Sequence, residues 1–229
     1  MTLQVPNLST DAQAELRAHA IPVRPIYSGP YGRFFKRLMD LSLVLLSAPI
    51  VVPVILFLAL AITLTGNVPF YTQQRVGRGG VPFRMWKLRT MVKDADRNLE
   101  SYLSQSPKAR AEWDSTQKLK NDPRITPLGR VLRKTSIDEL PQLFNVFNGT
   151  MSLVGPRPMM VGQEDYYTGH AYYELSPGIT GLWQVCDRNE CSFTDRVAYD
   201  TLYSRQMSFK TDEGILFKTL GVVWRATGY

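Results

Sequence analysis

The sequence predicts a mainly helical α+β protein that is attached to a membrane. Three patterns predict this class: an uncharged apolar run at residues 41–64, helical spacing of apolar residues at 94–113 and 140–147, and alternation of apolar and basic residues at 83–91. A long uncharged run indicates a membrane segment, a spacing of three or four residues indicates helices, and alternation indicates a strand. The 229 residues suit one ordinary domain with appendages.

Residues 1–30 form an N-terminal leader that precedes this domain. They are rich in proline and poor in apolar periodicity, so we expect a mobile segment with at most a short helix at residues 11–20. The apolar run begins too deep in the chain for a signal peptide.

The apolar run from Leu41 to Leu64 has two prolines in its middle. As a straight helix its 24 residues would reach about 36 Å, long enough to cross a bilayer. Pro49 and Pro53 each remove a backbone donor, so we expect a kink or break there. Ser47 is placed to satisfy a carbonyl freed at the bend.

Basic residues flank the apolar run on both sides, and such residues mark the cytoplasmic face of a membrane. A re-entrant hairpin broken at Pro49 or Pro53 satisfies both flanks, while a single span with proline kinks is the alternative. A buried soluble helix is disfavoured by the uncharged length. The flanking residues are Arg33, Lys36 and Arg37 before the run, and Arg75, Arg78, Arg84, Lys87 and Arg89 after it.

The remaining elements follow from local patterns. Residues 83–91 are predicted to be a strand with its basic residues on one face, and 94–113 an amphipathic helix interrupted near Pro107. A core-packed helix is expected at 140–147, ended by Asn148-Gly149. Residues 176–181 indicate a turn-rich loop, and the apolar stretch 215–224 is expected to pack inside or to lie on lipid.

The composition favours anionic partners. The formal net charge is +7 and the pI is about 9.5, which suits nucleotide phosphates or anionic lipid. Lys and Arg are scattered and no nucleic-acid-binding motif is present, so no nucleic-acid partner is expected. Cys186 and Cys191 have too few ligands nearby for structural zinc, and we expect reduced cytosolic thiols.

The stretch from Arg133 to Pro158 is the strongest candidate for chemistry. Ser136-x-x-Glu139 fits a capping box, and Pro141 is tolerated only in a first helical turn, which places Asp138 at or next to a helix N-terminus. Such a position stabilises a carboxylate and attracts phosphate. Asp138 and Glu139 would point about 100° apart, which suits separate tasks: attack on phosphorus, and binding of a metal.

Arg157 lies between two prolines and would lose little freedom on binding an oxyanion. Magnesium suits such a site, because it prefers one or two carboxylates together with substrate phosphate oxygens. The structural alternatives are an ordinary helix start for the two acids and a stiff surface turn for Gly155-Pro156-Arg157-Pro158.

Four segments together resemble the bacterial sugar transferase family, the monotopic phosphoglycosyl transferases. They are KRLMDLSLVLL (36–46), KLRTM (87–91), NDPRITPLGRVLRKTSIDELPQLFNVFNGTMSLVGPRP (121–158) and SPGITGLWQVCDRN (176–189). The resemblance covers residues 31–229 in the family's order. With the segments RVAYDTLYSRQMSF and FKT near the end, the chain looks most like ExoY-type members that initiate exopolysaccharide assembly.

The resemblance implies a reaction and roles for several residues. Asp138 would attack the β-phosphate of a UDP-hexose, galactose or glucose, releasing UMP and leaving a phosphosugar on the carboxylate; undecaprenyl phosphate would then accept it. Glu139 would bind Mg²⁺ and Arg157 a phosphate. Other positions match family motifs with less specific roles: Lys87, Arg89, Arg133 and Arg188 around the substrate, and Arg124, Gln184 and Asp200 for substrate or structure.

The resemblance also implies an architecture. The leader (1–30) would precede a re-entrant helix with its basic flank (31–66) and a compact cytoplasmic catalytic domain (67–229) on the bacterial inner membrane, with both termini in the cytoplasm. A homo-oligomer is left open. The chain departs from the family's Ser-Pro break, because Pro53 follows Val52 and Ser47 is separated from Pro49 by Ala48. CDRNEC also replaces the usual small-residue and glycine version after Gln184-Val185.

Two other functions compete with this interpretation. A glycosyltransferase with a D-x-D metal site would have to use Asp94-Ala95-Asp96, which lies in a charged helix without a Gly-rich nucleotide loop, and it would release UDP instead of UMP. A non-catalytic, membrane-anchored anion-binding module would account for the net charge alone.

Overall fold

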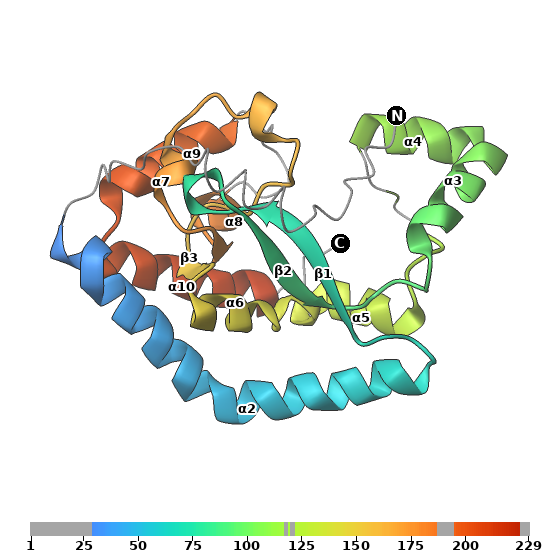
Figure 1. Cartoon of the computed structure of the whole chain (residues 1–229), viewed down its shortest axis with the longest axis horizontal. Helices are drawn as coiled ribbons and strands as arrows, with labels where there is room; N and C mark the ends of the chain where they lie inside the picture. The colour runs from blue at the N-terminus through green and yellow to red at the C-terminus, as the bar shows by residue number, and fades with distance from the viewer. Residues whose placement is uncertain (1–28, 117–118, 120–121, 187–194, 225–229) are drawn as a thin grey trace.

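The structure is a computed structural model that describes residues 29–116, 119, 122–186 and 195–224. The expected leader helix at 11–20, together with Arg188 and Cys191, lies outside the described residues. The described part is mostly helical with two small sheets, as predicted (Figure 1). A long helix lies along one side, and the remaining elements pack above it.

The elements follow one another in this order: the π-turn η1 (Tyr31–Phe35), α2 (Lys36–Leu64), β1 (Phe70–Val76), η2 (Arg78–Gly80), β2 (Pro82–Leu88), α3 (Ala95–Gln105), α4 (Pro107–Thr116), α5 (Pro127–Thr135), η3 (Ile137–Glu139), α6 (Gln142–Asn148), β3 (Ser152–Val154), η4 (Glu164–Tyr166), α7 (Ala171–Glu174), β4 (Gly178–Thr180), α8 (Leu182–Cys186), α9 (Asp195–Gln206) and α10 (Phe209–Trp224).

Helix α2 contains the apolar run and continues through both prolines. Figure 1 shows it bent near its middle rather than broken into two helices. The expected role of Ser47 is wrong in detail: Pro49 frees the carbonyl of Leu45, four residues back, whereas the Ser47 hydroxyl donates to the carbonyl of Val44 at 3.0 Å. The bend therefore leaves one helix intact.

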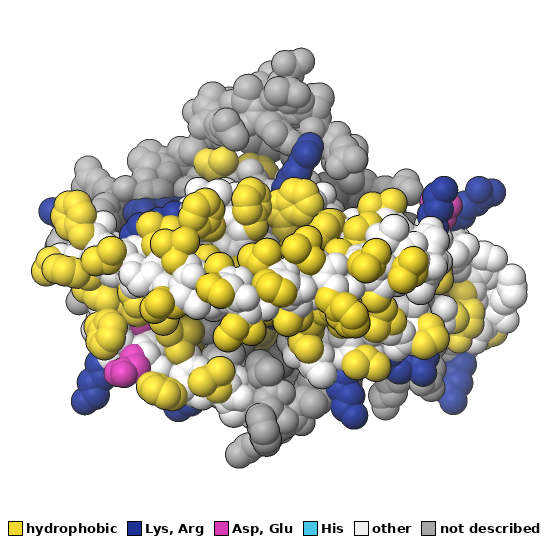
Figure 2. Space-filling view, turned by 90° about the horizontal axis from the view of Figure 1, so that it is seen from below, with side chains coloured by type: hydrophobic (Ala, Val, Ile, Leu, Met, Phe, Trp, Pro, Cys, Tyr) yellow, Lys and Arg dark blue, Asp and Glu magenta, His cyan; other side chains and the backbone are white. Residues whose placement is uncertain are grey.

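Most of α2 is exposed, unlike a soluble core helix. Within the described residues, Tyr31–Leu64 is the one helix long and apolar enough to cross a bilayer, and 11% of its most apolar window is buried. Figure 2, seen from below, shows hydrophobic side chains spread over this face of the molecule. Val131 of α5 and Phe144 and Phe147 of α6 are further exposed apolar side chains, each at least half exposed.

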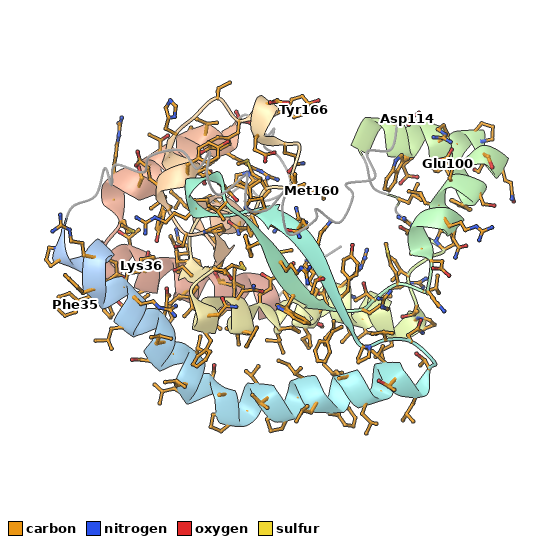
Figure 3. All side chains as sticks on the ribbon, in the orientation of Figure 1. Phe35, Lys36, Glu100, Asp114, Met160 and Tyr166 are labelled. Carbon is orange, nitrogen blue, oxygen red and sulfur yellow. The ribbon has the colours of Figure 1, made fainter. Side chains whose placement is uncertain are left out.

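The first turn of α2 is bonded to the body of the protein. The Lys36 ammonium lies 2.6 Å from a carboxylate oxygen of Asp212 in α10, and the Tyr31 and Tyr203 hydroxyls donate to the same fully buried carboxylate. Figure 3 labels Lys36 beside the neighbouring helix. Arg37 donates to the carbonyls of Val146 and Phe147 at the end of α6. Helix α2 is thus part of the fold and not only an anchor.

Strands β1 and β2 form an antiparallel hairpin with Phe70 opposite Leu88 and Val76 opposite Pro82. The strand predicted at 83–91 is confirmed, but its basic residues do not share one face. Successive side chains of a strand point to opposite faces, so Arg84 points away from the face that carries Lys87. Arg84 is exposed, whereas Phe83 and Met85 on the face of Lys87 are buried in the core.

The predicted loop at 176–181 contains the short strand β4, which pairs in parallel with β3. Three glycines allow the chains to meet here: a Cβ at Gly155 would lie 2.3 Å from the Ser176 carbonyl oxygen, and one at Gly178 or Gly181 would lie 2.1 Å from backbone atoms of Gly155. These glycines therefore allow two backbones to approach closely. Local sequence signals do not distinguish glycines with this role from glycines of an ordinary loop.

Of the other predicted helices, one is confirmed and one differs from expectation. The helix predicted at 94–113 is divided into α3 and α4 next to Pro107, and Leu99, Leu103 and Trp113 pack together, as expected. In α6, by contrast, the buried side chains are Gln142, Asn145 and Val146, while both phenylalanines are exposed. The apolar stretch at 215–224 lies in α10, where Ile215 is buried and Phe217 and Leu220 are exposed.

Candidate active site

The two candidate acids lie in η3, a single 3₁₀ turn between α5 and α6. Thr126 caps the start of α5, because its hydroxyl accepts a hydrogen bond from the Gly129 amide at 2.9 Å. Ser136 caps the end of this helix in a left-handed conformation with φ of 57°. The predicted capping box is therefore wrong. Ser136 makes no side-chain cap bond, because it terminates the preceding helix instead of starting the next one.

Asp138 is buried in this turn and is 8% exposed. Burial raises the pKa of its carboxyl to about 6, the neighbouring Glu139 charge raises it further, and the positive charges of Lys87 and Arg133 oppose this rise. A carboxylate taken out of water is a stronger nucleophile when ionised, because it is less stabilised by solvent. Lys87 and Arg133, two of the basic residues that the sequence predicted around the site, thus act on Asp138 electrostatically.

Glu139 is bound to Lys87 across the gap between η3 and β2. The ammonium lies 2.7 Å from one carboxylate oxygen, and each side chain is 21% exposed. The pair is open to solvent on one side, so Glu139 is accessible from the cleft that both residues line. The nucleophile candidate and the metal-ligand candidate therefore have different surroundings, one buried and one half-buried.

Arg157 is another residue that lines this cleft. The loop that carries Arg157 follows β3 and is held by the Gly155 amide, which donates to the Thr180 carbonyl at 2.9 Å. Residues from six segments line the cleft: Arg75, Met85, Lys87, Glu139, Gln142, Arg157, Pro158, Gly178 and Ile179. Three basic side chains thus face a space with one lining carboxylate, which suits an anion.

Arg75 is the lining residue that sequence reasoning missed, since it was counted only as a basic flank of the apolar run. In the hairpin it lies opposite Phe83, and this register puts it on the same face as Met85 and Lys87. The glycine-rich turn at 77–80 between two alternating stretches is a hairpin signal that could have located it.

The remaining predicted residues lie around the cleft or away from it. The Arg133 Nε donates to the Thr90 hydroxyl at 2.8 Å, and burial lowers the pKa of this guanidinium. The Arg89 Nε donates to the Val68 carbonyl at 2.9 Å, and Arg89 is not among the residues that line the cleft. Arg124 forms a buried ion pair with Asp122 at 2.6 Å.

Two further family-matched residues are buried. Gln184 lies next to Gly181, and neither atom of its buried amide has a hydrogen-bond partner. Asp200 accepts a hydrogen bond from the Tyr167 hydroxyl at 3.0 Å, and burial raises the pKa of its carboxyl to about 7.

The rival metal site at Asp94-Ala95-Asp96 lies at the start of α3, in the arm that α3 and α4 form (Figure 1). Asp94 is exposed there. Within the described residues, no three His, Cys, Asp or Glu side chains come together as a metal site. A metal bound to this part of the chain would need ligands from a substrate.

The structure thus combines a cleft lined by three basic side chains, a buried carboxylate and an exposed apolar helix. Comparison with known proteins gives the class: the profile of the family described as Bacterial sugar transferase matches residues 31–226, and the chain belongs to this family.

Three relatives are informative. The chain is 46% identical over 199 residues to the UDP-galactose-lipid carrier transferase of Erwinia amylovora and to the undecaprenyl-phosphate galactose phosphotransferase of Salmonella typhimurium, covering 86% of this chain and 42% of each relative. It is 42% identical over 208 residues to the exopolysaccharide production protein ExoY of Rhizobium meliloti, with 90% of both chains covered. The chain spans about two fifths of the first two relatives.

Proposed function

We propose that this protein transfers a hexose 1-phosphate from a UDP-hexose, galactose or glucose, to undecaprenyl phosphate and releases UMP, the first step of exopolysaccharide repeat-unit assembly. The observation that carries this proposal is the cleft lined by the Lys87–Glu139 pair and Arg157. The buried Asp138 lies next to Glu139 in the chain and close enough to Lys87 for its charge to act on the Asp138 carboxyl. The names of the relatives in Salmonella typhimurium and Rhizobium meliloti support it.

The proposed reaction has two displacements at one phosphorus atom. A carboxylate oxygen of Asp138 bonds to the β-phosphorus while the bond to the bridging oxygen breaks, and UMP leaves with that oxygen and both electrons. An oxygen of undecaprenyl phosphate then bonds to the same phosphorus, and the Asp138 carboxylate is released unchanged. Arg157 and Lys87 stabilise the charge that builds up on the phosphate oxygens.

The donors present fit a magnesium ion. Mg²⁺ prefers one or two carboxylates completed by phosphate oxygens and waters, and the cleft offers Glu139 at its rim with no third acid among the described residues. Glu139 would hold the ion, which would neutralise diphosphate charge. Lys87, bonded to the same carboxylate at 2.7 Å, would help to orient Glu139 in the cleft that both residues line.

The exposed helix α2 supports a lipid substrate. Its apolar side chains cover the face shown in Figure 2, and the phosphate of a polyprenyl lipid lies at the surface of a bilayer. We infer that α2 enters and leaves the cytoplasmic leaflet of the inner membrane by its bend, with the catalytic domain and both ends of the chain on the cytoplasmic side. Basic residues on both flanks favour this arrangement.

One assay tests the proposed function. The purified full chain in detergent is given undecaprenyl phosphate, Mg²⁺ and a panel of UDP-sugars, and nucleotide products are separated. We expect UMP with UDP-galactose or UDP-glucose. Release of UDP, or no nucleotide release with any sugar, would contradict the proposal.

A further inference from the structure

The cleft contains more positive charge than its acids balance. Lys87 is bonded to Glu139 at 2.7 Å. Among the described residues, no carboxylate forms an ion pair with Arg75 or Arg157. Two guanidiniums therefore face the same space with no acid bound to either.

Arg75 is held by neutral groups only. One terminal nitrogen donates to the Gln73 side-chain oxygen at 2.7 Å, and the other approaches the Pro158 carbonyl at 3.4 Å. The Nε atom is buried and has no hydrogen-bond partner among the residues that the structure describes. These contacts orient the guanidinium without balancing its charge, and a buried cation with an unused donor is costly unless an anion joins it.

The positive charge of Arg157 makes burial of the Arg75 guanidinium more unfavourable. Burial and, after it, the positive charge of Arg157 lower the pKa of Arg75 to about 10, although the negative charge of Glu139 opposes this change. The two backbone segments that carry these side chains are bonded to each other: the Val76 amide donates to the Met159 carbonyl at 3.0 Å, and Arg75 pairs with Met160 across a β-bridge. Met160 is labelled beside the hairpin in Figure 3. Backbone bonds thus keep two like charges together.

We propose that Arg75 binds a phosphate oxygen of the substrate's diphosphate and forms, with Arg157, a clamp of two guanidiniums. The proposal rests on the proposed function for the identity of the diphosphate. An anion between the two side chains would balance their charge and accept from the unused Nε.

Binding of inorganic diphosphate to the full chain in detergent, measured calorimetrically without Mg²⁺, tests the clamp apart from catalysis. Arg75→Gln removes the charge but keeps an amide that can bond to Gln73, and it should weaken binding at least tenfold. Arg84→Gln, on the opposite face of the same hairpin, is the matched control and should change binding less than twofold. The unfolding temperature of unliganded Arg75→Gln should be unchanged or higher, because a like-charge repulsion is removed.

Three results would overturn the clamp. The first is diphosphate binding by Arg75→Gln within twofold of the unmodified protein, and the second is equal weakening by Arg84→Gln. The third is weaker binding by Arg75→Gln together with a lower unliganded unfolding temperature, because this pair of effects would indicate that Arg75 only bonds to Pro158 as a structural contact. If Arg75→Gln does not fold, Arg75→Lys replaces it; this variant keeps the charge but not the planar fork, and unweakened binding would also overturn the clamp. Failure of UMP release with an intact clamp would count against the proposed function alone.

Discussion

The Asp40 carboxylate in α2 accepts a hydrogen bond from the Ser152 hydroxyl 2.7 Å away, although the two residues are 112 positions apart in the chain. The other carboxylate oxygen accepts from the Leu153 amide at 3.2 Å. Both donors belong to β3, the strand that leads directly into the Arg157 loop. Helix α2 is therefore bonded to the strand that leads into the Arg157 loop of the candidate active site.

Asp40→Asn should weaken both stability and catalysis. An amide has one oxygen where the carboxylate has two, so one of the two buried donors loses its acceptor, and we expect a loss of about 2 kcal/mol in unfolding free energy. UMP release should fall as well, because β3 carries the Arg157 loop. Ser42→Ala, an exposed change two residues further along α2, is the control for thermal unfolding and activity. Equal behaviour of the two variants would contradict this coupling.

Asp138→Asn should abolish the covalent step. Asparagine keeps the size of the side chain but is not a nucleophile toward phosphorus, so UMP release should fall more than about 1,000-fold. Mass spectrometry should detect a phosphosugar adduct on the unmodified chain incubated with UDP-hexose alone, and none on the variant. Asp114→Asn, an exposed acid on the α3–α4 arm, should retain full activity. Undiminished transfer by Asp138→Asn would exclude this mechanism.

Glu139→Gln should weaken the dependence on magnesium and activity together. Loss of one charged ligand is expected to raise the Mg²⁺ concentration for half-maximal activity about tenfold or more. Glu100→Gln is a matched control, since Glu100 is also paired with a basic residue, Arg110 at 2.5 Å, but on the arm. An unchanged magnesium titration for Glu139→Gln would count against its assignment as the metal ligand.

The sequence predicted what local patterns determine. The division of residues 94–113 at Pro107 and the end of α6 at Gly149 follow from backbone restrictions of single residues. The exposed side chains of Phe144 and Phe147 were not predicted, because helical periodicity identifies an apolar face but not whether protein or lipid covers it.

The sequence by itself grouped candidate site residues only where they are close along the chain. Asp138, Glu139 and Arg157 lie in one stretch, and Lys87 was added by resemblance. Arg75 depends on the register of a hairpin, and the bond between Asp40 and Ser152 on tertiary packing. At Ser136 a local pattern was misleading. The sequence fits a capping box, but Ser136 is the C-cap of the preceding helix α5 and makes no side-chain cap bond to the next turn.

Cysteine labelling tests the arrangement of α2 in the membrane. With Cys186 and Cys191 replaced by serine, single cysteines at Pro30 and Arg110 should react with a membrane-impermeant maleimide only after the cytoplasmic face is opened, because both flanks of the helix are basic. Intact spheroplasts should leave both sites unlabelled. Labelling of one site from each side would establish a single span and refute the re-entrant arrangement.

Asp200 should make the protein less stable as pH rises. Burial raises the pKa of its folded-state carboxyl to about 7 from an ordinary value of 3.8. Between these values the folded state binds more protons than the unfolded state, so the unfolding free energy from this group falls with increasing pH. Asp200→Asn stays neutral and can still accept from Tyr167, so at pH 8 it should be more stable than the unmodified protein by on the order of 2 kcal/mol, with little difference at pH 4. Asp165→Asn, at an exposed position in η4, should follow the unmodified protein at both values. Thermal unfolding in detergent measures all three proteins, and a gain at pH 4 as large as that at pH 8 would show that ionisation of Asp200 is not the cause.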